Sequence, residues 1–131
     1  MNIALGIGCD RDTPAGTIAR CITEALAKAG ATPADVRAVA SIDLKANEPG
    51  LLDALRSHGW ICRFHSATVL AGVTVPNPSE VVRRYTGTPS VAEAAALLAA
   101  NADQSALLVE KHRLRGLDGR NATVSIARCR T

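Results

Sequence analysis

The sequence predicts an α/β fold, a three-layer α/β/α sandwich around a five-stranded mixed sheet. Short apolar runs bounded by turns alternate with segments whose apolar residues recur every three or four positions, which are the patterns of strands and of helices. A last segment, residues 122–126, alternates apolar residues with Thr and Ser, and this pattern predicts an antiparallel edge strand. With right-handed crossovers, the simplest strand order is 3-2-1-4-5.

The first strand, loop and helix are predicted by residues 2–30. A short apolar run contains Gly6 and ends at Gly8, and glycines allow the backbone a sharp turn or a close approach. Thr13 is expected to be the N-cap of the following helix, with Pro14 at its first position. An apolar stripe then recurs at helical spacing until Gly30, which is expected to end the helix.

The middle of the chain continues the alternation. The predicted elements are a helical turn at 32–35, a strand at 36–42, a helix at 50–58, a strand at 60–65 and a helical turn at 66–71.

Two further helix starts are predicted by capping residues. Asn77 and Glu80 have the spacing of a capping box, so a helix is expected through residues 81–85. Ser90 and Glu93 have the same spacing, or Thr88 caps the next helix directly, and an alanine- and leucine-rich helix should run to residue 100. The continuous apolar run 106–109 predicts a central strand covered on both faces.

Composition limits the classes of function. We expect residues 1–131 to form one domain with an aliphatic core, since 47% of the chain is hydrophobic and only 2% is aromatic. So few aromatic side chains disfavour nucleic-acid binding by base stacking. The sequence shows no secretion signal and no apolar run long enough for a spanning helix, so we expect a cytoplasmic protein without membrane association. The spacing of cysteines and histidines indicates neither a metal site nor a disulfide framework, and no cofactor is expected.

The C-terminal segment is basic. Residues 111–131 carry six Lys and Arg side chains against Asp118 alone, a net charge of +5 within a chain of net charge +3. Such a segment could contact phosphates or a polycarboxylate. It could equally be a pair of solvated strands whose charges protect the sheet edge.

The predicted topology brings several loops to one crevice. Ligands of open α/β sheets bind beyond the carboxyl ends of the strands, where the strand order reverses. The loops 8–13 and 43–48, the helix starts near 77 and 88 and the residues around 110–111 should meet there, and helix N-termini there would offer N–H groups to an anion. The predicted ligand-binding residues are Gly8, Cys9, Arg11, Thr13, Lys45, Asn77, Ser79, Gly87, Thr88, Ser90 and Lys111.

The sequence does not commit any residue to catalysis. Asp43, Lys45, Glu48 and Glu80 are the candidates for an acid, a base or an electrophile, although polar residues are typical of any strand end. Cys9 precedes a helix N-terminus, which would lower a thiol pKa, yet packing beside the turn explains it as well.

Nucleotide binding finds little support. A dinucleotide fingerprint would need a third glycine at position 11, which is Arg11, and a phosphate-binding loop of the ATPase type is absent from the sequence.

Five segments in order resemble one known family. They are GIGCDR at 6–11, SIDLKANEPGL at 41–51, VPNPSE at 75–80, GTPSVAEA at 87–94 and NATVSIAR at 121–128. Together they are similar to the CobE and CbiG C-terminal domain family of cobalamin biosynthesis, over nearly the whole chain. Since no sequence precedes the module here, the free-standing CobE type is the expected match. The resemblance implies a macrocyclic precorrin or corrinoid ligand rich in carboxylates, and CbiG itself opens a lactone on such a ring.

Three hypotheses of function follow. The first is a cobalamin-biosynthesis protein that binds a precorrin or corrinoid intermediate, as a carrier or as a helper to a pathway enzyme. The second is a hydrolase that opens a lactone or removes an acyl fragment, with water activated by Asp43, Glu48 or Glu80. The third is a non-catalytic subunit whose basic segment, with Arg113, Arg115 and Arg120, docks on an acidic pathway enzyme.

Overall fold

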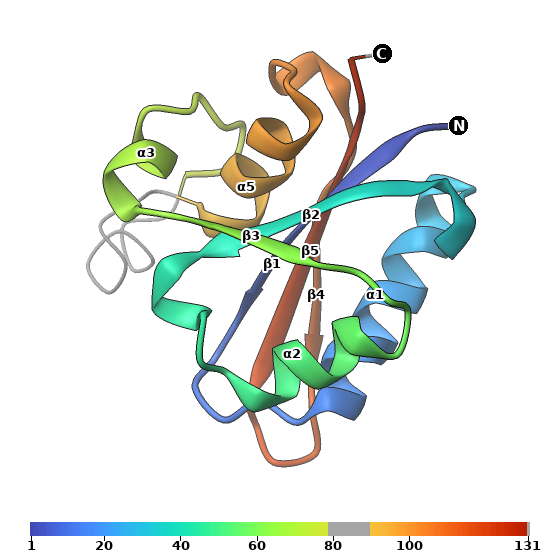
Figure 1. The fold of residues 1–131 in the computed structure, drawn as a ribbon, viewed down its shortest axis with the longest axis vertical. Helices are drawn as coiled ribbons and strands as arrows, with labels where there is room; N and C mark the ends of the chain where they lie inside the picture. The colour runs from blue at the N-terminus through green and yellow to red at the C-terminus, as the bar shows by residue number, and fades with distance from the viewer. Residues whose placement is uncertain (79–89, 131) are drawn as a thin grey trace.

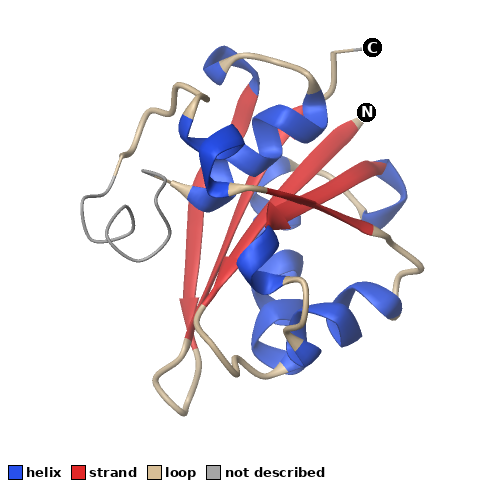
Figure 2. Cartoon of the chain, turned by 60° about the vertical axis from the view of Figure 1, so that its left-hand side comes forward, coloured by secondary structure: helices blue, strands red, loops and turns tan. Residues whose placement is uncertain are grey.

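The computed structural model, which describes residues 1–78 and 90–130, has a five-stranded mixed sheet with helices on both faces (Figures 1 and 2). The strands lie in the order β3-β2-β1-β5-β4. Their bounds are β1 Ile3–Cys9, β2 Val36–Ile42, β3 Cys62–His65, β4 Leu107–Arg115 and β5 Asn121–Arg128. The helices are α1 Ala15–Ala29, α2 Pro49–Arg56, α3 Ala67–Ala71 and α5 Val91–Ala100, with short 3-10 turns η1 Pro33–Asp35, η2 Asp43–Lys45 and η3 Gln104–Ala106.

The predicted α/β class, the mixed sheet and the antiparallel last strand are confirmed, but the order of the last two strands is exchanged. β5 pairs antiparallel with β1, from Ile3 opposite Arg128 to Cys9 opposite Ala122, and β4 forms the edge. The physical reason lies in their side chains. From Glu110 onward β4 carries exposed charges, whereas β5 is buried from Val124 to Ala127, so β5 occupies the interior.

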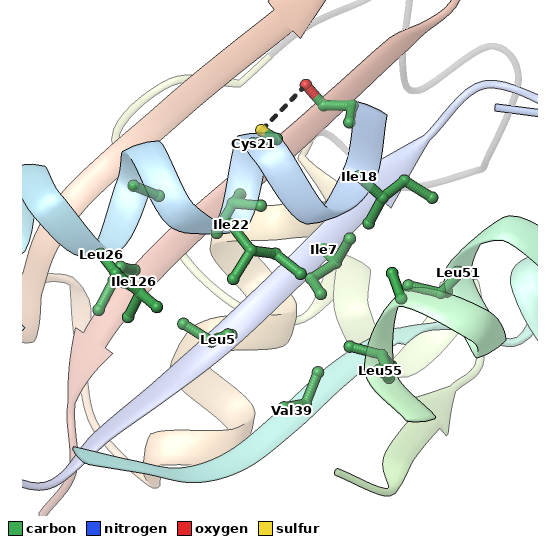
Figure 3. Packing of buried hydrophobic residues seen from close by; sticks show 14 of the residues in the cluster. Leu5, Ile7, Ile18, Cys21, Ile22, Leu26, Val39, Leu51, Leu55 and Ile126 are labelled. Carbon is green, nitrogen blue, oxygen red and sulfur yellow. Dashed lines mark hydrogen bonds between the residues drawn. The ribbon is translucent and has the colours of Figure 1, made fainter. Parts of the chain in front are cut away.

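One face of the sheet, the α1 face, packs large aliphatic side chains against α1 and α2. Leu5, Ile7 and Val39 from the sheet meet Ile22 and Leu51 from the helices, all 0–1% exposed (Figure 3). The thiol of Cys21 donates to the carbonyl oxygens of His112 and Ala122, both at 3.5 Å, which ties α1 to β4 and β5.

The other face, the α5 face, is built from small residues. Ala4 and Ala127 pack against the alanines of α5, and Ala40 packs nearby. A methyl group on Gly6 would lie 1.9 Å from the carbonyl oxygen of Ala92 and 2.5 Å from the amide nitrogen of Ala96. Only a glycine therefore allows α5 to lie so close to β1.

The helix starts differ from the predicted caps. Pro14, not Thr13, is the N-cap of α1, because the Thr13 hydroxyl donates to the Asp10 carbonyl at 2.7 Å instead. Ser90 does precede α5, but its side chain makes no capping bond, and Glu93 bonds to Asn77 rather than back to the cap. The helix predicted through 81–85 lies outside the described residues.

Candidate functional site

A cavity of about 400 Å³ lies at the carboxyl ends of β1 and β2. Four parts of the chain contribute: β1 with its following loop, the end of β2 with η2, the start of α5, and the β4–β5 hairpin. The lining residues are Gly8, Cys9, Asp10, Arg11, Ile42, Lys45, Ser90, Val91, Ala92, Lys111, Arg113, Asn121 and Thr123.

The strand directions explain why these segments meet. β1 and β2 are parallel, so their carboxyl ends lie at the same end of the sheet. β5 is antiparallel to β1, so its first residues lie at that same end of the sheet, with Thr123 opposite Gly8. The N-terminus of α5 adds backbone N–H groups and the positive end of a helix dipole to the same space.

The cavity is cationic. Arg11, Lys45, Lys111 and Arg113 line it, and Asp10 is the single carboxylate among its described lining residues. Asp10 is already engaged, since one of its oxygens accepts from the backbone N–H of Asn121 at 2.7 Å and from its side-chain amide at 3.1 Å. Ile42, Val91 and Ala92 add apolar surface between the charges. The site therefore suits an anion with an apolar body.

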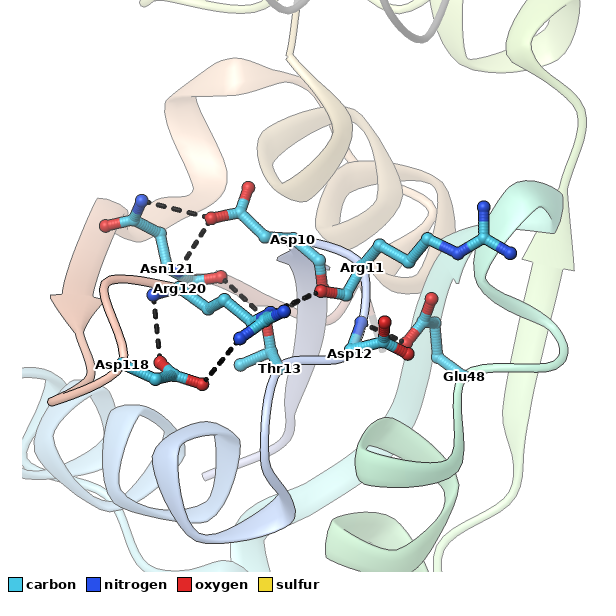
Figure 4. A network of polar contacts seen from close by, with 8 residues as sticks. All are labelled: Asp10, Arg11, Asp12, Thr13, Glu48, Asp118, Arg120 and Asn121. Carbon is cyan, nitrogen blue, oxygen red and sulfur yellow. Dashed lines mark hydrogen bonds and ion pairs between the residues drawn. The ribbon is translucent and has the colours of Figure 1, made fainter.

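The loop after β1 is held from both sides (Figure 4). Asp12 has a left-handed backbone (φ 63°), and its N–H donates to Oε2 of Glu48 at 3.1 Å. On the other side, Nε of Arg120 donates to the backbone carbonyl of Arg11 at 3.0 Å, while Asp118 pairs with the Arg120 guanidinium at 3.1 Å. The Arg11 side chain extends away from Asp118 and Arg120, on the Glu48 side of the loop (Figure 4). Its backbone is held by Arg120, and its guanidinium makes no hydrogen bond to another residue that the structure describes.

The thiol of Cys9 is a weak acid. Burial raises the pKa of Cys9 from 9.0 to about 11; the Lys45 ammonium lowers it, and the Glu48 and Asp10 carboxylates raise it. Cys9 is therefore protonated at neutral pH, which is the opposite of the activated thiol considered from the sequence.

The cavity brings together several of the predicted binding residues: Gly8, Cys9, Arg11, Lys45, Ser90 and Lys111. Thr13 is 1% exposed and does not line it, and Asn77 lies outside the lining but accepts a hydrogen bond from Lys111. Ser79, Glu80, Gly87 and Thr88 lie outside the described residues.

Neither described candidate for a catalytic carboxylate lines the cavity. Asp43 begins η2 on the outside, and Glu48 is occupied by the amide of Asp12.

Sequence reasoning missed Arg113, Asn121 and Thr123 as cavity residues. A signal existed for Arg113 alone. It follows Lys111 by two positions, and residues at that spacing share one face of a strand. Asn121 and Thr123 required the correct position of β5.

Within residues 1–78 and 90–130, no helix is long and apolar enough to cross a membrane.

Comparisons with known proteins agree with one another. The family model described as "Cobalamin synthesis G C-terminus" matches residues 3–127. The chain is 41% identical to Protein CobE of Sinorhizobium sp over 111 residues, covering 83% of this chain and 71% of that protein. It is 34% identical over 125 residues to the cobalt-precorrin-5A hydrolase of Priestia megaterium, covering 95% of this chain but 32% of that larger protein. The crystal structure of CobE, a protein from the cobalamin biosynthetic pathway, superposes with a TM-score of 0.78 at 34% identity, covering 97% of this chain and 89% of that one.

Proposed function

Since the chain belongs to the CobE and CbiG C-terminal family of cobalamin-biosynthesis proteins, we propose that it binds a precorrin or corrinoid intermediate in the cavity at the carboxyl ends of β1 and β2. The observation that carries the proposal is the gathering of Arg11, Lys45, Lys111 and Arg113 around one partly apolar hollow. Corrin precursors are large, mostly apolar rings with several acetate and propionate arms, so the ligand and the cavity have complementary chemistry.

Each part of the cavity has a distinct task in this proposal. The guanidinium groups of Arg11 and Arg113 bind carboxylates through paired hydrogen bonds, and the lysines act as point charges. The N–H groups at the start of α5 receive a further carboxylate oxygen. Ile42, Val91 and Ala92 contact the ring itself.

The volume of the cavity bears on the carrier role. At about 400 Å³ it lies near the lower end of pockets that enclose small molecules, roughly 300–1,000 Å³. A macrocycle is therefore held along part of its edge while the rest stays accessible. A ligand held in this way can be passed to a pathway enzyme, which favours a carrier or helper.

The hydrolase alternative has less support in the geometry. Of the described carboxylates that could activate water, Glu48 is engaged with Asp12, Asp43 is outside the cavity and Asp10 is engaged with Asn121. The hydrolase relative is about three times longer than the region this chain matches, so its reaction does not transfer to this chain by similarity alone.

The docking alternative is also weakened. Arg113 lines the cavity, whereas the Arg120 guanidinium is bonded to Asp118 and to the backbone of Arg11. Arg113 and Arg120 therefore do not belong to one free basic surface.

The test is a titration of the purified protein with hydrogenobyrinate, followed by the absorbance of the macrocycle. We expect saturable binding at micromolar concentration. Lys45→Ala and Arg113→Ala should each raise Kd about tenfold to a hundredfold, since a hydrogen bond to a charged group contributes about 1.5–3 kcal/mol.

The matched controls remove the same charges elsewhere. Lys28→Ala changes an exposed lysine in the last turn of α1, and Arg56→Ala changes an exposed arginine of α2 that pairs with Asp53 at 2.9 Å. Both should leave Kd unchanged. An unaltered spectrum at micromolar concentration, or controls that weaken binding as much as the cavity variants, would refute the proposal.

A further inference from the structure

The edge strand β4 contains a bulge beside the cavity. Val109 pairs with Ile126 and His112 pairs with Val124, so three steps along β4 match two steps along β5. The extra residue lies at Glu110–Lys111, where the Ser125 hydroxyl donates to the Glu110 carbonyl at 2.6 Å. Bulges re-aim side chains, and they often do so next to functional sites.

The bulge changes which way two neighbouring side chains point. Successive residues of a regular strand face opposite sides of the sheet. Here Glu110 and Lys111 both reach Asn77, whereas His112 lies on the α1 face, with Nε2 at 2.7 Å from Glu24 Oε1. A carboxylate and an ammonium group from adjacent positions are thus brought to the same side.

Asn77 connects these side chains to the core of the protein. Its amide nitrogen donates to Oε2 of Glu93 at 2.6 Å and to Oε1 of Glu110 at 3.0 Å, and its backbone carbonyl accepts from Nζ of Lys111 at 3.3 Å. Glu93 is 0% exposed and lies within α5. The backbone of Asn77, and with it the acceptor for Lys111, is therefore anchored to a buried helix and to the bulge.

We propose that Asn77 is a positioning residue that fixes Lys111 at the cavity as a preorganised cation for one carboxylate of the ligand. This inference rests on the proposed function. A lysine side chain has many rotamers, and ordering it on binding lowers affinity. The contacts of Asn77 order Lys111 before a ligand arrives, whereas no hydrogen bond from the Lys45 ammonium to another described residue is present. Lys111 is thus the cation that selects where a carboxylate is placed.

The first experiment is a double-mutant cycle on hydrogenobyrinate binding. We expect Asn77→Ala to raise Kd about fivefold to tenfold, because it removes both amide contacts and releases the carbonyl that holds Lys111. Combined with Lys111→Ala, it should add less than a twofold further loss. In the double variant with Lys45→Ala, the two increases in Kd should multiply in full. A full multiplicative effect with Lys111→Ala, or no effect of Asn77→Ala alone, would overturn the proposal.

The second experiment needs no corrinoid. The side-chain ammonium and Cε signals of Lys111 are followed by NMR in the free protein, with exposed Lys28 as the internal reference. Asn77→Ala should shift the Lys111 signals toward those of Lys28 and leave Lys28 unchanged; unshifted Lys111 signals refute the positioning role. Asn77→Leu, which has a similar shape but no donor for the two carboxylates, should release Lys111 in the same way and serves if the alanine variant does not fold. If the wild-type protein fails to bind the corrinoid, the proposed function falls, and this measurement still decides the role of Asn77.

Discussion

The two faces of the sheet are packed with side chains of different size. On the α1 face, side chains such as Leu5, Ile7 and Val124 separate the helices from the strands by a layer of branched aliphatic groups. On the α5 face, Gly6 and Ala4 leave almost no layer, and the backbone of α5 approaches the backbone of β1 directly. Burial of large groups on the first face supplies most of the hydrophobic stabilisation. Small residues on the second face bring the start of α5 to the cavity.

This division suggests that stability and binding depend on different faces. The α1 face contributes few cavity residues, while the start of α5 and the α5-side residues of β1, β4 and β5 line the cavity. Substitutions on the α1 face should therefore lower the free energy of unfolding and leave affinity intact. Those on the α5 face should change the affinity for the ligand.

The largest effect is expected on the α1 face. Ile22→Ala removes a side chain that is 1% exposed and leaves a cavity under α1, which typically costs about 2–5 kcal/mol. The free energy of unfolding, measured with urea, should fall by that amount, while Kd for the corrinoid per folded molecule stays unchanged. The matched change Ala96→Gly on the α5 face should cost only about 1 kcal/mol. A larger loss at Ala96 than at Ile22 would contradict the comparison.

Gly6→Ala tests the close approach of α5. The added methyl group meets backbone atoms of Ala92 and Ala96, which cannot move without the helix, so we expect a loss of about 1–3 kcal/mol together with weaker binding. Gly8→Ala is the control, because its methyl group would lie 3.8 Å from Val91 in ordinary contact. The free energy of unfolding should change there by less than about 0.5 kcal/mol. Equal losses at Gly6 and Gly8 would show that α5 is not held against β1 in this way.

The same contrast explains where prediction from the sequence succeeded and where it failed. The strands and helices were predictable from periodicity, since the α1-face residues recur regularly. The strand order was not predictable, because Thr123 and Ser125 resemble the solvent-exposed face of an edge strand. In the structure they lie on the α5 face, where small side chains fit. The Ser125 hydroxyl donates a hydrogen bond to the Glu110 carbonyl. The apolar run 106–109 is only the start of a charged edge strand.

The candidate site was predictable where it depended on the parallel strands. Arg11 and Lys45 follow β1 and β2, whose carboxyl ends must share an edge. Asn121 and Thr123 required the position of β5, which the pattern of the side chains concealed, whereas Arg113 required only its spacing to Lys111. The anchoring of Lys111 by Asn77 depends on a bulge, and a one-residue irregularity in strand pairing leaves no mark in a hydrophobic pattern.

Cys21, on the α1 face, makes the free energy of unfolding depend on pH in alkaline solution. Burial raises the pKa of Cys21 on the α1 face from 9.0 to about 12, and the nearby Glu24 carboxylate raises it further, against the effect of hydrogen bonds to its sulfur. The unfolded chain loses this proton first, so the stabilisation is complete below pH 9 and is lost as the pH rises toward 12. We expect the free energy of unfolding to fall in this range by roughly 1 kcal/mol per pH unit. Cys21→Ala should flatten the dependence; an unchanged slope would contradict the assignment.

The smallest effect is expected where the α1 face meets the bulge. The hydrogen bond from His112 lowers the pKa of Glu24, partial desolvation opposes it, and the charges of His112 and Arg20 lower the pKa further. A carboxyl with a lowered pKa stabilises the fold above its ordinary pKa of 4.5, and this contribution is lost as the pH falls through its value in the folded protein. Glu24→Gln should therefore reduce the loss of stability in acid, measured by thermal unfolding between about pH 6 and pH 3.

The same variant tests whether the two faces are independent. His112 and Lys111 are neighbours, but after the bulge the strand alternates regularly, so the two side chains lie on opposite sides of β4. Loosening His112 through Glu24→Gln should consequently leave Kd for the corrinoid within twofold of the wild-type value. If Kd instead rises as much as in Lys111→Ala, the edge strand transmits changes from the α1 face to the cavity, and the separation of stability from binding fails at the strand that both faces share.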